Sequence, residues 1–156
     1  MILSTHFIVG AAVAGTTSNE ALLLVLPLVS HFILDSFPHW EYIDEIKELK
    51  HKPWHLFFDI VAGPAITLIT LLLLNDFSVA KIAWVIIGGI IGILPDGLVF
   101  LGYLFFPKNK IFQKYESFHR FIHSKKKLAW EVGATQQIVI FILAIFLLAS
   151  GFNLQK

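Results

Sequence analysis

Apolar runs of helical length, separated by shorter polar segments, follow one another along the whole chain. They predict five hydrophobic helices, over residues 2–15, 21–37, 54–74, 81–106 and 133–152. A helix needs roughly 20 apolar residues to cross a bilayer, so the first run is either a short span or a re-entrant helix. Its glycines and alanines suit close packing against another helix.

Local signals indicate where two of these helices begin and break. Asn19 or Ser18 is placed to cap the second helix. The fourth run contains GGIIGILPDG at 88–97, and because proline removes a backbone donor we expect this helix to be broken at Pro95. The backbone groups freed there would have to face protein or a cavity, and not lipid.

The two longest polar segments differ in charge. Residues 38–53 carry acidic and basic side chains together and predict a short interfacial helix, whereas residues 107–127 form a strongly basic loop. If the helices alternate in direction, these segments share one face of the membrane and hold ten of the twelve basic residues. The positive-inside rule makes that face cytoplasmic.

Composition sets the class of protein. Hydrophobic residues make up 56% of the chain, charged residues 15%, and the mean hydropathy is +0.75. These values exclude an ordinary water-soluble domain and indicate an integral membrane protein, with no nucleic-acid partner expected. Because no linker or repeat divides it, we expect residues 1–156 to form one all-α, membrane-embedded domain. The chain has no cysteine, so a metal must be held by His, Asp and Glu.

Ionisable residues recur in pairs at i, i+4 spacing, which places both side chains of a pair on one helical face. Such a pair can bind one ion from a single helix, which is why this spacing recurs in metal sites. Three pairs fall in the predicted cytoplasmic half of the protein: His31 with Asp35, His55 with Asp59, and His119 with His123.

Asp96 lies well inside the fourth apolar run, where a bare carboxylate would cost several kcal/mol. Binding a divalent cation keeps such a carboxylate ionised. Nitrogen and oxygen donors without sulfur favour Zn²⁺, with Mn²⁺ or Fe²⁺ as alternatives, and the donors exceed what one tetrahedral ion needs, so we expect two or more ions. The predicted ligands are His6, His31, Asp35, His55, Asp59, Asp96, His119 and His123.

Four further polar residues are assigned other roles. His39 follows the helix-ending Pro38 and is expected to handle protons in catalysis. Arg120 suits an anionic substrate, because a guanidinium group binds phosphate through two parallel hydrogen bonds. Glu131 is a candidate extra ligand, whereas His51 is expected to be hydrated at the interface.

Three short motifs, STHFIVGAAVAG at 4–15, GIIGILPD at 89–96 and FHRFIHS at 118–124, resemble elements of the bacterial and archaeal membrane-bound metal-dependent hydrolases, a family that includes LexA-regulated inner-membrane proteins. The resemblance implies a place in the prokaryotic inner membrane and the metal ligands His6, Asp96, His119 and His123. The chain has Leu98 where the family has a second acidic residue, and Ile122 where it has threonine. The His-x-x-x-Asp pairs are also similar, more weakly, to ligands of zinc-dependent phospholipase C and P1-type nucleases.

The leading hypothesis is therefore a membrane-embedded, metal-dependent hydrolase of phosphoester or ester bonds, acting on a lipid headgroup at the cytoplasmic interface. The alternatives are a non-catalytic transporter that handles metal ions or protons with the same residues, and a membrane di-iron oxidase. Short spans and the lack of an inverted repeat count against a transporter. Two of the three pairs are His-Asp, whereas a di-iron oxidase uses histidine-rich boxes.

Overall fold

A computed structural model describes residues 1–42, 53–74 and 79–154, with the side chains of 152–154 left aside, and confirms the all-α class. Most of the expected interfacial helix over 38–53, including His51, lies outside the described residues. Within the described ranges the regular structure is helical, apart from an isolated bridge between His39 and Lys127. The helices are α1 (Leu3–Gly15), α2 (Glu20–Ser36), α3 (Pro53–Leu73), α4 (Val79–Phe105), α5 (Lys110–Ile122) and α6 (Trp130–Leu154).

Helices α3, α4 and α6 are long and apolar enough to cross a membrane. Their outward faces carry many exposed leucine, isoleucine, valine and phenylalanine side chains, as expected where the surroundings are lipid and not water. The chain thus has the features of a membrane protein. Among the described residues, α1 and α2 are apolar but shorter, with 13 and 17 residues.

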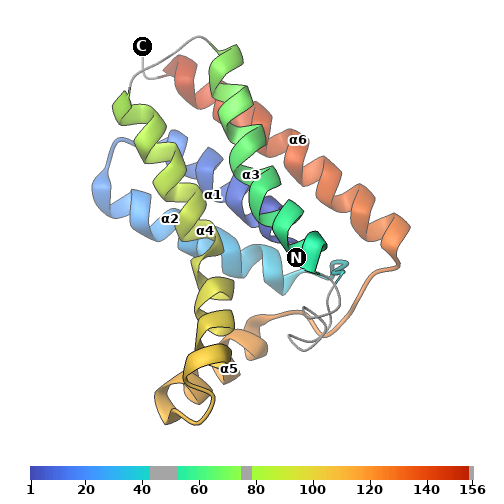
Figure 1. The fold of residues 1–156 in the computed structure, drawn as a ribbon. Coiled ribbons are helices and arrows are strands. Elements are labelled where there is room, and N and C mark those ends of the chain that lie inside the picture. The colour runs from blue at the N-terminus through green and yellow to red at the C-terminus, as the bar shows by residue number, and fades with distance from the viewer. Residues whose placement is uncertain (43–52, 75–78, 155–156) are drawn as a thin grey trace.

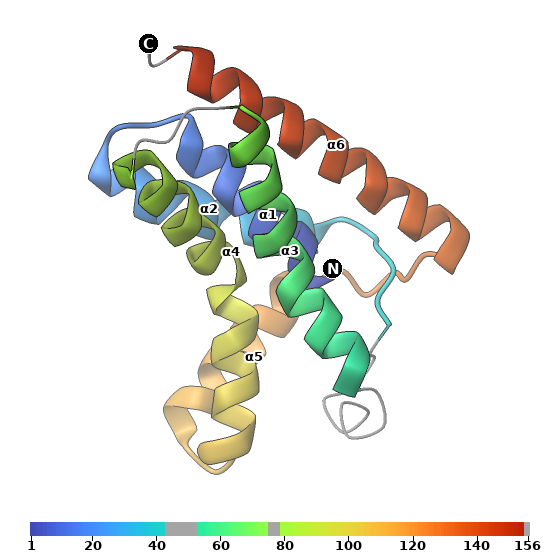
Figure 2. The same cartoon turned by 45° about the horizontal axis from the view of Figure 1, so that its top comes forward.

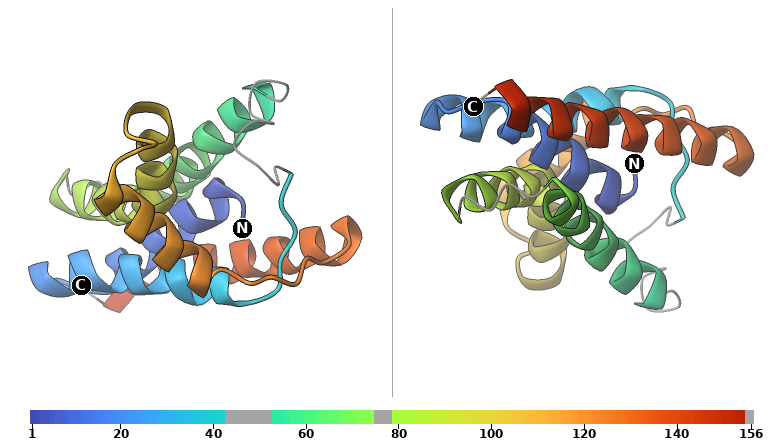
Figure 3. Two further views of the ribbon diagram at one scale, coloured as in Figure 1. Left: turned by 90° about the horizontal axis from the view of Figure 1, so that it is seen from below. Right: turned by 90° about the horizontal axis from the view of Figure 1, so that it is seen from above.

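Helix α1 lies in the middle of the bundle, with α2, α3, α4 and α6 packed around it (Figure 3). Ten of its 13 residues are buried, and its apolar side chains form the centre of the hydrophobic core. The short first run therefore forms a central helix enclosed by the others. Its length of about 20 Å, at 1.5 Å per residue, falls short of a bilayer's hydrocarbon thickness of about 30 Å.

Glycines allow α4 to approach α1 closely. A Cβ atom added at Gly10 would lie 2.6 Å from the carbonyl oxygen of Gly88, and one added at Gly92 would lie 2.5 Å from the carbonyl oxygen of His6. Real Cβ atoms do not come so close to backbone atoms, so these positions require glycine. The Gly-rich run thus brings the middle of α4 against the first two turns of α1.

Helix α4 continues through Pro95 as one helix, so the predicted break at this residue is wrong. Figure 1 shows instead that α4 changes direction between its two halves. Proline removes a single backbone donor. Two backbone carbonyl groups near this proline take part in hydrogen bonds with side chains. The hydroxyl of Tyr115 donates to the carbonyl of Pro95 at 2.9 Å, and Nδ1 of His31 lies 2.8 Å from that of Gly92.

The basic segment 107–127, expected to be a loop, contains α5. Asn109 begins this helix, because its side chain accepts hydrogen bonds from the backbone N–H groups of Ile111 and Phe112. Asn19 caps α2 in the same way, which confirms one of the two predicted caps. The chain after α5 runs along the end of α2, where the N–H of Ser124 donates to the carbonyl of Asp35 at 2.7 Å.

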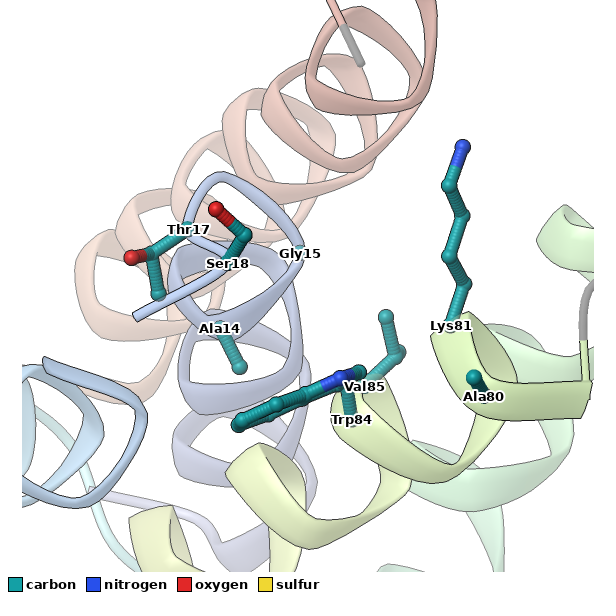
Figure 4. Close-up of a pocket in the computed structure, with 8 residues that line it drawn as sticks. All are labelled: Ala14, Gly15, Thr17, Ser18, Ala80, Lys81, Trp84 and Val85. Carbon is teal, nitrogen blue, oxygen red and sulfur yellow. The ribbon is translucent and has the colours of Figure 1, made fainter. Parts of the chain in front are cut away.

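A cavity of about 200 Å³ lies at the end of the bundle away from Met1, between the end of α1 and the start of α4 (Figure 4). Its lining contains no histidine or carboxylate and so differs in chemistry from the predicted metal site. The lining residues are Ala14, Gly15, Thr17, Ser18, Ala80, Lys81, Trp84 and Val85.

Candidate metal centre

Four predicted ligands meet where α2, α4 and α5 converge, and we call them the first cluster: His31, Asp35, Asp96 and His119. Nε2 of His31 lies 3.2 Å from Oδ2 of Asp35 and 3.2 Å from Nε2 of His119. Nε2 of His119 lies 3.3 Å from Oδ1 of Asp96. The longer separations are 3.9 Å, between Nε2 of His31 and Oδ1 of Asp96, and 3.8 Å, between Nε2 of His119 and Oδ2 of Asp35. Three helices far apart in sequence thus supply one group of donors.

These separations are close to those between the donors of a tetrahedral metal site. Bond lengths of about 2.0–2.2 Å to nitrogen and oxygen imply donor–donor separations of about 3.3–3.6 Å around a tetrahedral ion. The five measured separations of the first cluster span 3.2 to 3.9 Å. Each of these five pairs is therefore close enough to share one ion, and His6, His31, Asp35 and Asp96 offer four donor atoms that all lie within 4.8 Å of one another.

Backbone hydrogen bonding fixes which nitrogen of His31 faces the cluster. Its Nδ1 lies 2.8 Å from the carbonyl oxygen of Gly92, and since a carbonyl oxygen only accepts, Nδ1 carries the proton. In the neutral ring Nε2 then presents a lone pair to the Asp35 carboxylate. Two acceptors facing each other at 3.2 Å repel unless a proton or a metal ion lies between them, and a ring whose other nitrogen donates to a carbonyl is the usual form of a metal-bound histidine.

Two buried polar atoms support the same conclusion. Nδ1 of His6 and Oδ2 of Asp35 are buried, and within the described part of the chain neither has a hydrogen-bond partner. His6 packs on His31 with ring centroids 4.2 Å apart, and its Nε2 lies 3.0 Å from Oδ1 of Asp35. Buried polar atoms without partners are costly, and an ion beside Asp35 would satisfy its second oxygen.

A second cluster, Asp35, His39, Glu41 and His123, adjoins the first and shares Asp35 with it. Nε2 of His39 and Nε2 of His123 each lie 3.0 Å from Oε1 of Glu41. The Met1 amino group lies among these donors, 3.1 Å from Oδ1 of Asp35, 2.7 Å from Nε2 of His39 and 2.9 Å from Oε1 of Glu41. A positive charge is therefore already accommodated at this point.

The second cluster repeats the hydrogen-bonding pattern of the first. Nδ1 of His39 faces the carbonyl oxygen of Phe37 at 2.7 Å, which turns Nε2 toward Glu41. Burial alone would raise the pKa of Glu41, but its hydrogen bonds to His123 and His39 outweigh this and lower it. The hydrogen bond to Glu41 in turn raises the pKa of His123, against the effect of burial. Glu41 is thus held ionised, as a metal ligand must be.

Asp35 joins the clusters through its two oxygens, because Oδ2 faces His31 and Oδ1 faces the second cluster. Its side chain is 1% exposed, whereas Asp96 is 27%, His123 23% and Glu41 19% exposed. The combined site is therefore closed at Asp35 and open along the edge formed by these other three residues.

The pair His55 and Asp59 lies apart from both clusters. The oxygens of Asp59 accept hydrogen bonds from the backbone N–H groups of Leu3 and Ser4, each at 2.8 Å, and from the hydroxyl of Tyr42 at 3.0 Å. Asp59 thus caps the N-terminus of α1 from a neighbouring helix. The exposed His55 ring stacks on Tyr42 with centroids 5.9 Å apart.

Removing this cap should destabilise the fold and leave metal binding intact. Asp59→Ala leaves the buried N–H of Ser4 and the half-buried N–H of Leu3 without their partner, and an unpaired buried donor costs about 1–3 kcal/mol. We expect a clear decrease in the thermal unfolding temperature of the detergent-solubilised protein, with an unchanged ratio of metal to folded protein. Loss of metal at unchanged stability would instead make Asp59 a ligand.

Two other residues with predicted roles lie outside the clusters, and a third lies inside one. Arg120 is 75% exposed and pairs with Glu116, one turn earlier on α5, so it does not reach the clusters in this arrangement. Glu131 is exposed in the first turn of α6 and belongs to neither cluster. His39, assigned to proton handling because it follows Pro38, lies within the second cluster at ligand distance.

Sequence reasoning missed Glu41. It lies in the segment of mixed charge for which the sequence predicts only a short interfacial helix. A local signal was present, because His39 and Glu41 alternate around Trp40 in an extended segment, which places them on the same side of the chain. The backbone carbonyls that orient the rings, such as those of Gly92 and Phe37, cannot be identified from the sequence, because every residue has one.

The donor sets fit divalent metal ions. Each cluster offers two imidazoles and two carboxylates, a combination suited to Zn²⁺, Mn²⁺ or Fe²⁺. In the second cluster an ion would have to displace the Met1 amino group from among Asp35, His39 and Glu41. Three features agree with metal binding. Backbone carbonyls orient the rings of His31 and His39. Glu41 is held ionised, and one oxygen of Asp35 has no hydrogen-bond partner among the described residues. No family model, curated protein or solved structure matches the chain.

Proposed function

We propose that this protein is a membrane-embedded hydrolase that binds two divalent metal ions, with zinc as first choice, and cleaves a phosphoester or ester bond of a lipid headgroup. The observation that carries the proposal is the shared carboxylate. Asp35 turns Oδ2 to His31 and Oδ1 to the Met1 amino group among the donors of the second cluster, so this one buried carboxylate would serve two ions if the second replaced the amino group.

Bound divalent ions lower the pKa of a coordinated water toward neutrality and neutralise the charge on phosphoryl oxygens. The chain supplies the rest. Gly92 and Phe37 orient the histidine rings through their carbonyl groups. The buried Asp35 excludes water from the closed side of the site. Glu41, ionised on the open edge, balances the positive charge there.

A lipid substrate is supported by where the site lies. The open edge includes Glu41, just after α2 ends, and its neighbour Tyr42 contacts Asp59 and His55 in the first turns of α3. Trp54 and Trp130, at the first turns of α3 and α6, are 67% and 60% exposed, and tryptophans of this kind mark the headgroup level of a membrane. A headgroup phosphate can therefore meet the site without leaving the bilayer.

The resemblance to membrane-bound metal-dependent hydrolases gives further support. The four ligands that it implies all belong to the two clusters or pack against them: His6, Asp96, His119 and His123. The basic segment on the same side supports a cytoplasmic orientation in a prokaryotic inner membrane.

The test combines metal analysis with an assay. Purified protein in nanodiscs should contain two ions per chain and hydrolyse bis(p-nitrophenyl) phosphate or phosphatidic acid in a chelator-sensitive reaction. His119→Gln should remove one ion and lower turnover by ~100-fold or more, given the 10–100-fold cost of losing even an outer-shell partner. His55→Gln, on the separate pair, is the matched control and should leave both unchanged.

Two outcomes contradict the proposal. Folded protein without bound metal, after growth and purification with zinc, manganese or iron present, would show that the clusters form a proton-handling network. Bound metal without turnover of any ester, together with metal uptake into proteoliposomes, would identify a carrier.

A further inference from the structure

Helix α5 has three distinct faces along its length. One faces the metal centre through His119, with Tyr115 and Phe112 on the same side, where Phe112 packs against Gly102 of α4. A second, polar face carries Gln113 and Ser117 in one line, both exposed. The third is apolar and directed away from the bundle.

The apolar face is unusually exposed. Ile111, Phe118 and Phe121 follow one another at i, i+7 and i+10, which places them on one stripe of the helix. They are 80%, 52% and 82% exposed. Phe105 and Phe106, at the end of α4, are also exposed, at 67% and 60%. Figures 1 and 2 show α5 and the second half of α4 side by side, projecting from the bundle.

The segment that contains this helix is strongly basic. Between residues 106 and 129 the chain has seven basic residues and one acidic residue, Glu116, which pairs with Arg120. Lys114 lies on the apolar stripe itself, three residues after Ile111, and is exposed. The other basic residues in this segment are Lys108, Lys110, Arg120, Lys125, Lys126 and Lys127.

We propose that α5 is an interfacial helix that binds the surface of an anionic bilayer. The stripe of Ile111, Phe118 and Phe121 enters the acyl region, the surrounding lysines contact lipid phosphates, and the line of Gln113 and Ser117 faces water. Large apolar side chains interleaved with lysines are what an anionic membrane surface binds. A second copy of the chain is disfavoured as the partner, because it would bring two positively charged surfaces together.

This inference is independent of hydrolysis, but it affects the metal centre. Helix α5 contacts the rest of the bundle mainly through the His119 face and the hydroxyl of Tyr115. A bilayer that binds the opposite face holds α5 against α4 and so keeps His119 beside Asp96. Anionic lipid should therefore tighten metal binding at the first cluster.

The natural chain has no cysteine, so single labels can be placed without altering other sites. Ile111→Cys and Phe121→Cys, labelled with the fluorophore NBD, are reconstituted into nanodiscs of phosphatidylcholine alone or mixed with phosphatidylglycerol. Ser117→Cys, on the polar face, is the matched control. We expect blue-shifted emission and quenching by brominated lipid at 111 and 121 but not at 117, with stronger quenching in the anionic nanodiscs.

A charge variant completes the test. Lys108→Glu, Lys110→Glu and Lys114→Glu together alter exposed residues outside both clusters, and they should abolish the dependence of quenching on phosphatidylglycerol. Emission at 111 and 121 typical of water in both lipids would overturn the proposal. So would energy transfer between labelled copies that increases with protein density while lipid quenching is absent, since a second chain would then cover the stripe.

Discussion

Asp35→Asn should abolish binding of both metal ions, whereas His119→Gln should abolish binding of one. Asp35 is the residue that the clusters share, with Oδ2 3.2 Å from Nε2 of His31 and Oδ1 3.1 Å from the Met1 amino group, which lies among the donors of the second cluster. Asparagine keeps the shape but provides no negative charge, and one of its two terminal atoms is a donor that cannot bind a cation. Turnover should fall with the metal.

The measurement is the metal-to-protein ratio after passage through a chelating resin, with circular dichroism as the check on folding. Asp59→Asn is the matched control, because Asp59 is also a buried carboxylate at 8% exposure but caps α1 outside the clusters. It should retain both ions. If Asp35→Asn retains one ion at full occupancy, the two clusters do not share this ligand.

The convergence of ligands could be predicted from sequence only where both members of a pair lie on one helix. His31 and Asp35 are one turn apart on α2, and their i, i+4 spacing suffices to place them together. His55 and Asp59 have the same spacing, but the first turn of α1 comes to lie against Asp59 and takes both its oxygens. Spacing identifies a pair that can bind; tertiary contacts decide what it binds.

Helix α5 shows why an interfacial helix is missed. Its apolar positions are divided between a face toward the bundle and an outward stripe, and lysines between them reduce the mean hydropathy. A search for long apolar runs therefore passes over it. The local signals were Asn109 as a cap and the apolar positions 111, 118 and 121 on one stripe.

The largest effect on folding is expected at Gly92. A side chain here meets backbone atoms of α1, namely the carbonyl oxygen of His6 at 2.5 Å and Cα of Gly10 at 3.2 Å from its Cβ, and backbone cannot rotate away. Gly92→Val should destabilise the protein by at least the ~1–3 kcal/mol typical of overpacking. Because Asp96 follows one turn later, displacing α4 from α1 should also weaken metal binding at the first cluster.

Gly97→Val on the same helix separates this contact from helix propensity. No atom lies within 4 Å of a Cβ built at Gly97, so valine there changes the intrinsic helix preference equally without meeting another helix. Thermal unfolding should show a large decrease for Gly92→Val and almost none for Gly97→Val, with metal affinity following the same order. Equal stability of the two variants would mean that the approach of α4 to α1 does not hold Asp96 in the site. With the expected order of stability and metal affinity, the Gly-rich run before Pro95 is the element that positions a metal ligand by allowing two backbones to touch.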